Sequence, residues 1–185
     1  MRSITVVVPG MVVLVGPAGV GKSTFAARHF RPDEILSSDE LRGAIRGDPT
    51  DQSVTRVAFG ILHRELGKRL AAGHLVVVDA TNLTRAARLA ILRAARPAGV
   101  RPIAVVLVAA PEVVHARNAA RGPRAVPSEV VERHLAAAAS LGETEDAAAD
   151  VLLAEGFAAV HVVATAATTG AEVRFLQVRT APTHS

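Results

Sequence analysis

A glycine-rich segment placed directly after a short apolar run limits the folds open to this chain. Residues 12–15 (VVLV) read as a buried strand, and residues 16–24 (GPAGVGKST) follow with the spacing GxxxxGK[ST]. Glycines in such a turn let several backbone N–H groups converge on an anion, and the helix N-terminus that follows adds a favourable dipole. The sequence therefore predicts a strand, a phosphate-binding loop and a helix, in that order.

The residue types at the end of this loop indicate a nucleoside triphosphate with its metal ion. A lysine can reach the β and γ phosphates, and the next hydroxyl can bind Mg²⁺ that bridges them. A glycine-rich turn that only joins a strand to a helix is the alternative, but it does not require lysine and serine there. We expect ATP, or another NTP donor, with Mg²⁺ bound through Ser23. The expected nucleotide contacts are Gly16, Gly19, Gly21, Lys22, Ser23 and Thr24.

Short apolar, β-branched runs alternate with helical segments along the rest of the chain. This alternation predicts an α/β fold with a parallel sheet and helices on both faces, whose ligands bind beyond the carboxyl ends of the strands. Two C-terminal extended segments are expected to form an edge strand pair, and residues 1–8 an edge strand. The expected strands of the parallel sheet are residues 12–15, 35–36, 75–78, 103–108 and 160–163, and the C-terminal pair is residues 160–163 and 172–178.

Composition narrows the class of protein. A chain of 185 residues that is 50% hydrophobic fits one domain over residues 1–185, with one core. It has no cysteine for disulfides or thiolate zinc sites, no segment that reads as a signal peptide and no apolar run of membrane-spanning length, so we expect a cytoplasmic protein. With five Phe and no Tyr or Trp, a stacking platform for single strands is not expected. Any nucleic acid would be held mostly by its phosphates.

A carboxylate and an arginine follow the second expected strand. Asp39 and Arg42 are three residues apart, which places them on one face of a helix. Asp39 is the candidate general base that accepts the proton of an acceptor hydroxyl, and Arg42 would hold a phosphate with its planar fork. The alternative is that Ser38 and Asp39 only cap the helix.

The strand at residues 75–78 ends in Asp79, which resembles a Walker B carboxylate able to orient the Mg²⁺ shell through water. Thr81 and Asn82 would lie near the phosphates or simply begin the next helix.

An arginine segment follows the fourth strand and its helix. Arg117 and Arg121 are four apart and would share a helix face, while Gly122 and Pro123 end that helix, so that Arg124 lies in a loop able to fold over the nucleotide. Such a lid would neutralise charge in the transition state and exclude water. A solvated basic face is the alternative.

Taken in order, these motifs resemble the kinase domain of bacterial polynucleotide kinase-phosphatases, within the P-loop kinase group that includes zeta toxins. The resemblance covers nearly the whole chain and implies a P-loop kinase fold, sheet order 2-3-1-4-5, and an arginine lid. The motifs that carry it are residues 16–30, 37–43, 51–53, 76–82, 110–114, 116–124 and 155–157. By similarity, the active-site positions are Lys22, Ser23, Asp39, Arg42, Gln52, Arg117 and Arg124, with Arg121 as a further lid residue.

The activity that this resemblance implies is transfer of the γ-phosphate of ATP to the 5′-hydroxyl end of DNA or RNA, as in nucleic acid repair. Phosphatase or ligase domains, on a longer or a separate chain, would be its partners. Two other functions remain open: a small-molecule kinase acting on a sugar, nucleotide sugar or antibiotic, and a nucleotide-controlled switch without catalysis.

Overall fold

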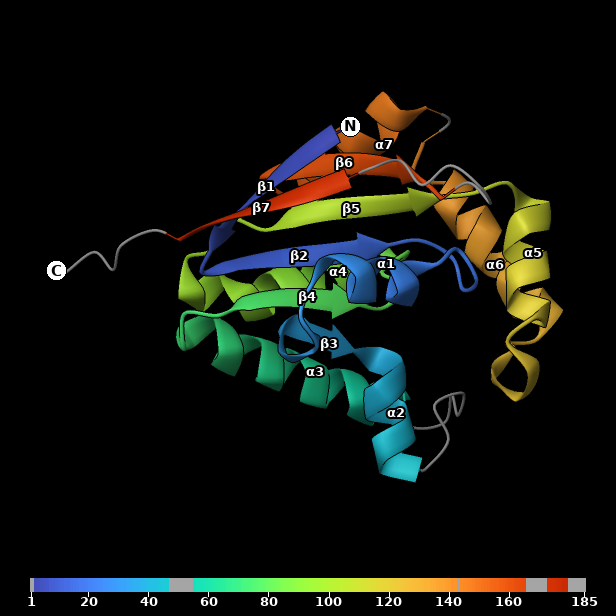
Figure 1. Cartoon of the computed structure of the whole chain (residues 1–185), viewed down its shortest axis with the longest axis horizontal. Helices are drawn as coiled ribbons and strands as arrows, with labels where there is room; N and C mark the ends of the chain where they lie inside the picture. The colour runs from blue at the N-terminus through green and yellow to red at the C-terminus, as the bar shows by residue number, and fades with distance from the viewer. Residues whose placement is uncertain (1, 47–54, 143, 166–172, 180–185) are drawn as a thin grey trace, which may run out of the picture.

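The computed structural model describes residues 2–46, 55–142, 144–165 and 173–179. A five-stranded sheet crosses the middle of the molecule, with all neighbouring strands parallel (Figure 1). The strands, in order across the sheet, are β3 (Ile35–Ser37), β4 (Leu75–Asp79), β2 (Gly10–Val15), β5 (Ile103–Val108) and β6 (Ala159–Ala164). The expected α/β fold is confirmed. The expected order, 2-3-1-4-5, counted the strand at residues 12–15 as the first strand. In the structure β1 precedes that strand, which is therefore numbered β2.

Helices connect these parallel strands. The carboxyl ends of the strands, and the polar residues that follow them, therefore lie at one edge of the sheet. Their bounds are α1 (Lys22–His29), α2 (Ser38–Arg46), α3 (Thr55–Ala71), α4 (Arg85–Ala95), α5 (Pro111–Ala119), α6 (Ser128–Ala139) and α7 (Glu145–Glu155), with 3₁₀ turns η1 (Pro32–Glu34), η2 (Arg96–Ala98) and η3 (Gly122–Arg124). Within the described stretches, none of the helices has both the length and the apolar character needed to cross a membrane.

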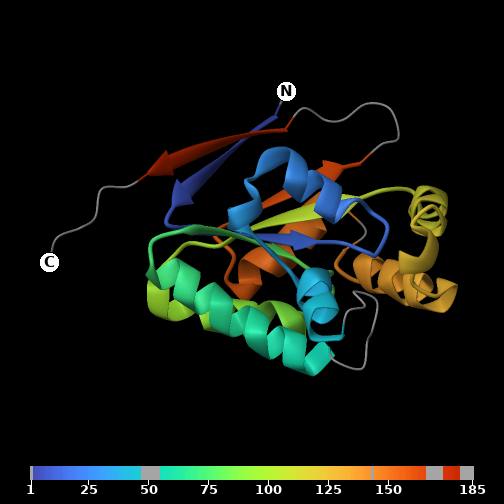
Figure 2. The same cartoon turned by 60° about the horizontal axis from the view of Figure 1, so that its bottom comes forward.

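One face of the sheet packs against α3, α4 and α7, which lie together below and behind it in Figure 2. Because side chains alternate along a strand, Met11 and Val13 of β2 point to this face. They share a core with Leu62 and Leu66 of α3 and Ile91 of α4, all of which are buried. These helices bury one face of the sheet.

The opposite face packs against α1, α5, α6 and the N-terminal strand. Val12 and Leu14 of β2 point to this side, where they join Phe25 of α1, Val114 of α5 and Val131 of α6. Strands buried on both faces explain the continuous apolar runs in the sequence. The expectation of helices on both faces is therefore confirmed.

The expected C-terminal strand pair is wrong. The strand β6 pairs along its length with β5, whereas β7 (Val173–Arg179) pairs in parallel with β1 (Arg2–Val8) in a separate two-stranded sheet. Ile4, Val6 and Val8 of β1 are buried in the core on the α1 side, which keeps β1 outside the main sheet. Strand propensity identifies extended residues, but the partner of a strand is decided by packing.

Candidate nucleotide-binding site

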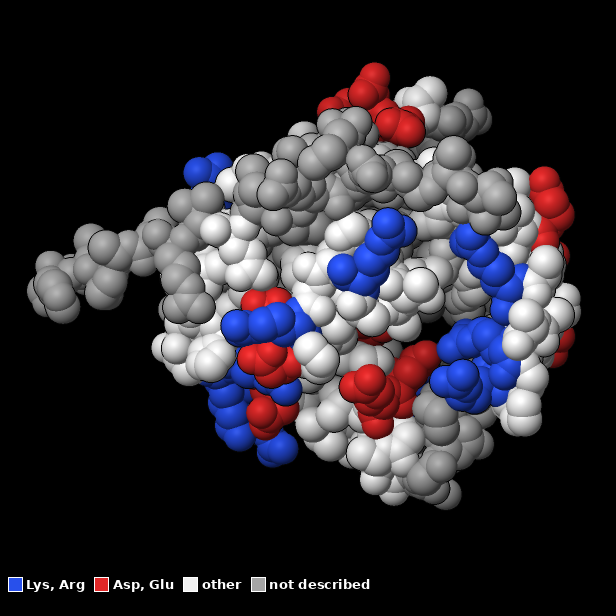
Figure 3. Space-filling view, in the orientation of Figure 1, with Lys and Arg blue, Asp and Glu red and all other residues white. Residues whose placement is uncertain are grey.

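A cavity of about 790 Å³ lies at the carboxyl edge of the sheet. Its lining comes from the glycine-rich loop and α1, from the start of α2, from the end of β4, and from the segment around α5 and η3. Figure 3 shows this face hollowed, with Lys and Arg side chains on one side of the hollow and Asp and Glu side chains on another. The sequence predicts ligand binding at this edge of the sheet, and the structure has a cavity there.

Two glycines of the loop hold conformations that other residues rarely adopt. Gly19 has φ of +86°, and a Cβ there would lie 2.6 Å from the carbonyl oxygen of Val114. Gly21, the residue before α1, has φ of +104°. Glycine is required at both positions, at Gly21 by the backbone and at Gly19 also by the close approach of α5. The loop and α5 are therefore packed against each other.

Lys22 is buried at the start of α1 and points into the cavity. Its Nζ donates hydrogen bonds to the carbonyl oxygens of Gly16, at 3.0 Å, and Pro17, at 2.8 Å. Burial lowers the pKa of Lys22 to about 8, although the carboxylates of Asp79 and Asp39 favour its charged form. The ammonium group is thus held inside the loop that is built to receive phosphate.

Ser23 and Asp79 form the contact between α1 and β4. The hydroxyl of Ser23 donates to Oδ2 of Asp79 at 2.7 Å. Burial raises the pKa of Asp79, while the Ser23 hydrogen bond and Lys22 oppose that shift. A hydroxyl and a carboxylate are hard oxygen donors of the kind that Mg²⁺ prefers. The pair fits the expected metal position, although the described residues contain no group of three or more His, Asp or Glu side chains that could hold an ion without the nucleotide.

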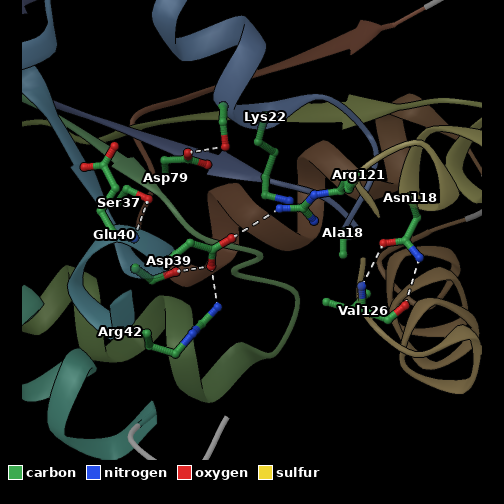
Figure 4. A network of polar contacts seen from close by, with 12 residues as sticks. Ala18, Lys22, Ser37, Asp39, Glu40, Arg42, Asp79, Asn118, Arg121 and Val126 are labelled. Carbon is green, nitrogen blue, oxygen red and sulfur yellow. Dashed lines mark hydrogen bonds and ion pairs between the residues drawn. The ribbon is translucent and has the colours of Figure 1, made fainter. Parts of the chain in front are cut away.

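Asp39 lies across the cavity from Lys22 and is held by two arginines (Figure 4). Oδ1 accepts an ion-paired hydrogen bond from Arg42, and Oδ2 lies 3.7 Å from the guanidinium of Arg121. The contact that caps α2 comes from Ser37, whose hydroxyl accepts the N–H of Glu40 at 3.4 Å. The carboxylate of Asp39 therefore faces the cavity and does not serve as the helix cap.

The arginines of the expected lid differ in their contacts. Arg117 donates to the carbonyl oxygen of Val20, at 3.1 Å, and to the hydroxyl and carbonyl oxygens of Thr165. Arg121 reaches toward Asp39, whereas Arg124 is exposed on η3 and lines the cavity. Arg121 lies two residues past the end of α5 at Ala119, so the two arginines are not on one regular helix, but both line the same cavity. The solvated-face alternative does not describe Arg117, which braces the phosphate loop.

Thr81 and Asn82 do not begin a helix, since α4 starts at Arg85 behind the cap Thr84. The carbonyl oxygen of Thr81 accepts the N–H of Gly16 at 3.0 Å, and the amide of buried Asn82 donates to the carbonyl of Leu14 at 2.7 Å. Both residues attach the end of β4 to the strand and loop beside it.

Sequence reasoning missed three residues around the loop. Asn118 exchanges two hydrogen bonds with the backbone of Val126, which fixes the path of the segment that carries Arg121 and Arg124. Thr165 donates to the carbonyl of Val20 at 2.8 Å, and its place just past a strand was an available signal. His134 of α6 contacts the loop, and nothing in its sequence surroundings indicated this. Gln52 lies outside the described residues, and Thr24 lines the cavity as expected.

A phosphate loop between a strand and a helix, a carboxylate after the neighbouring strand, and this parallel sheet define a P-loop kinase fold with a nucleotide-binding site. The family model for the AAA domain matches residues 11–143, and the chain belongs to that family. A search of curated proteins finds no match to the sequence.

Solved structures with the same fold are distant in sequence. A chain of the Pnkp1/Rnl/Hen1 RNA repair complex is 19% identical with a TM-score of 0.63, over 74% of this chain and 46% of that chain. Kti12 of Chaetomium thermophilum, in complex with ADP-AlF3, is 14% identical with a TM-score of 0.60, over 84% and 89%. A sugar kinase from Janibacter sp. HTCC2649 is 20% identical with a TM-score of 0.52, over 84% of each chain. These similarities establish the fold, and the acceptor has to be argued from the site.

Proposed function

We propose that this protein transfers the γ-phosphate of ATP to the 5′-hydroxyl end of a DNA or RNA strand. One observation carries the transfer step: the Asp39 carboxylate and the Lys22 ammonium line the same cavity, and the side chain of Arg121 lies between them in Figure 4. A phosphoryl donor bound in the loop would place its γ-phosphate between the two groups.

In the proposed step, the acceptor oxygen forms a bond to the γ-phosphorus as the bond from that phosphorus to the ADP oxygen breaks. The proton of the acceptor hydroxyl passes to Asp39, which Arg42 holds in place. Lys22 and Arg121 neutralise the negative charge on the transferring group and on the leaving ADP. Ser23 and Asp79 would hold Mg²⁺, which would supply further neutralisation of the phosphate charge.

The charges on the rim of the cavity support a strand as the acceptor. Arg28 of α1 is exposed, lines the cavity, and has no hydrogen bond or ion pair in the described part of the chain. A guanidinium in that position is free to contact a phosphate that lies beyond the reacting nucleotide. The motif resemblance to polynucleotide kinase domains, and the shared fold with a chain of an RNA repair complex, support the same acceptor.

The test is transfer of labelled phosphate from ATP to three acceptors: an oligonucleotide with a 5′-hydroxyl, the same oligonucleotide with a 5′-phosphate, and a set of sugars and nucleotide sugars. We expect label on the first alone. Transfer to a small molecule in preference to the oligonucleotide would establish the small-molecule kinase instead, for which the shared fold with a sugar kinase is a precedent. Binding of ATP without transfer to any acceptor would indicate a nucleotide-controlled switch.

A further inference from the structure

His134 contacts the tip of the phosphate loop from a helix that is remote in sequence. Its Nδ1 accepts a hydrogen bond from the backbone N–H of Ala18 at 3.3 Å, across 116 residues of chain. The imidazole is half-buried and lines the same cavity as Lys22. Backbone N–H groups of this loop are the groups that bind phosphate, so a side chain that orients one of them acts on the ligand site.

The rest of the loop tip is braced in the same way. Gly19 packs against Val114 and Asn118 of α5, and the carbonyl oxygen of Val20 accepts hydrogen bonds from Arg117 and Thr165. These contacts come from α5 and from the segment after β6. Among the hydrogen bonds described, the one from α6 to the tip is that of His134. It accepts from an N–H group of the tip, whereas Arg117 and Thr165 donate to a carbonyl oxygen.

We propose that His134 is a positioning residue for nucleotide binding, which orients the Pro17–Ala18 peptide so that the loop is formed before ATP arrives. The inference rests on the proposed function only in taking ATP as the bound molecule, and the acceptor does not enter it. An already formed loop avoids the entropy cost of ordering that peptide on binding, and this improves affinity.

The surroundings of the ring suit a hydrogen-bond acceptor. Burial, and then the positive charges of Lys22 and Arg133, lower the pKa of His134. Lys22, at the start of α1, lines the same cavity as His134, and Arg133 is the residue before His134 on α6. A neutral imidazole with its proton on Nε2 leaves Nδ1 free to accept, whereas a protonated ring would have no acceptor.

The test compares two substitutions that differ in one respect. His134→Asn places an acceptor oxygen near the position of Nδ1, while His134→Leu replaces the ring with an apolar side chain of similar bulk that has no acceptor. We expect His134→Leu to weaken ATP binding about fivefold, the usual effect of one hydrogen bond, and His134→Asn to stay within about twofold of the original. The KM for the 5′-hydroxyl oligonucleotide should not change in either variant.

The matched control is His115→Leu. Nε2 of His115 in α5 lies 2.8 Å from Oε1 of Glu132 in α6, so this change removes a histidine contact made with the helix that carries His134, but not a contact with the loop. We expect ATP binding by this variant to match the original protein. Thermal unfolding of every variant without ligand shows whether each is folded during the binding measurement.

Three results would overturn the inference: unchanged or tighter ATP binding by His134→Leu, equal weakening by the Leu and Asn variants, or equal weakening by His115→Leu. Tighter binding would mean that His134 competes with phosphate for the Ala18 N–H. If the original protein binds ATP but transfers no phosphate to oligonucleotides, the proposed function fails while this comparison still stands.

Discussion

The cavity has two sides, here called the donor wall and the acceptor wall, whose charged side chains differ in their exposure to solvent. The donor wall consists of Lys22, Ser23 and Asp79, and its charged residues are almost fully buried, with 9% of Lys22 and 5% of Asp79 exposed. The acceptor wall consists of Asp39, Arg42 and Arg121. Arg42 is buried there as well, but the side chain of Asp39 is 42% exposed and that of Arg121 is 32% exposed.

This difference indicates that the two walls have different roles in substrate binding. The donor wall binds the part of the substrate that is always the same, a polyphosphate, and burial there shifts the pKa values of both Lys22 and Asp79. The acceptor wall has to admit a second substrate and let it leave, so its carboxylate stays open to solvent and is held by ion pairs. Changes to the donor wall should therefore affect every acceptor, and changes to the acceptor wall should depend on the acceptor used.

The largest effect is expected for Lys22→Ala. It removes the positive charge from the position of the β and γ phosphates, so phosphate transfer should fall by about 10³-fold or more with any acceptor. Initial rates with labelled ATP measure this. Near-normal turnover would remove Lys22 from the site, and circular dichroism on the same sample confirms that the variant is folded.

Asp39→Asn should lower transfer to a 5′-hydroxyl oligonucleotide by about 10²-fold, because the amide keeps the shape of the side chain but cannot accept the proton. The affinity for ATP should stay close to that of the original protein, since Asp39 lies on the acceptor wall. Rates and ATP binding are measured on one preparation. Activity within a few-fold of the original would mean that Asp39 is not the general base, and Asp79 would become the candidate.

The dependence on pH should reveal the buried lysine. Above its lowered pKa of about 8, Lys22 becomes neutral in the free protein. The kcat/KM for ATP should then fall about tenfold between about pH 7 and about pH 9, because that ratio reports groups of the free enzyme. A flat profile over that range would show that Lys22 keeps its proton.

The deprotonation of Lys22 does not itself destabilise the folded protein as the pH rises. The folded protein holds Lys22 with a pKa below the ordinary lysine value of 10.5, so it binds fewer protons than the unfolded chain between about pH 8 and pH 10.5. The contribution of Lys22 to the free energy of unfolding therefore rises with pH in that window. A thermal melt at each pH separates the two causes.

The smallest effect is expected for Arg28→Ala. This exposed guanidinium on the rim should contribute through a phosphate of the strand, so the KM for an oligonucleotide should rise by about two- to fivefold, and less at high salt. The KM for ATP should not change. Arg64→Ala is the matched control, because Arg64 is also an exposed helical arginine but does not line the cavity. Equal KM values for the two variants would argue against a strand that leaves past α1.

Much of the donor wall was predictable from the sequence because local geometry determines it. A strand, a loop whose glycines need positive φ, and a lysine and serine at the start of a helix are neighbours along the chain, so their spacing fixes their relation in space. The pairing of Asp39 with Arg42 was predictable for the same reason, since both lie on one face of α2.

The tertiary structure decided the contacts between segments far apart in the sequence. It turned Arg117 toward Val20 and Thr165, brought His134 to Ala18, and paired β7 with β1. These outcomes depend on which surfaces pack together, and residue type and spacing along one segment do not contain that information. The sequence by itself therefore determined the phosphate-binding chemistry and the fold class, while only packing decided what braces the loop and what faces the acceptor.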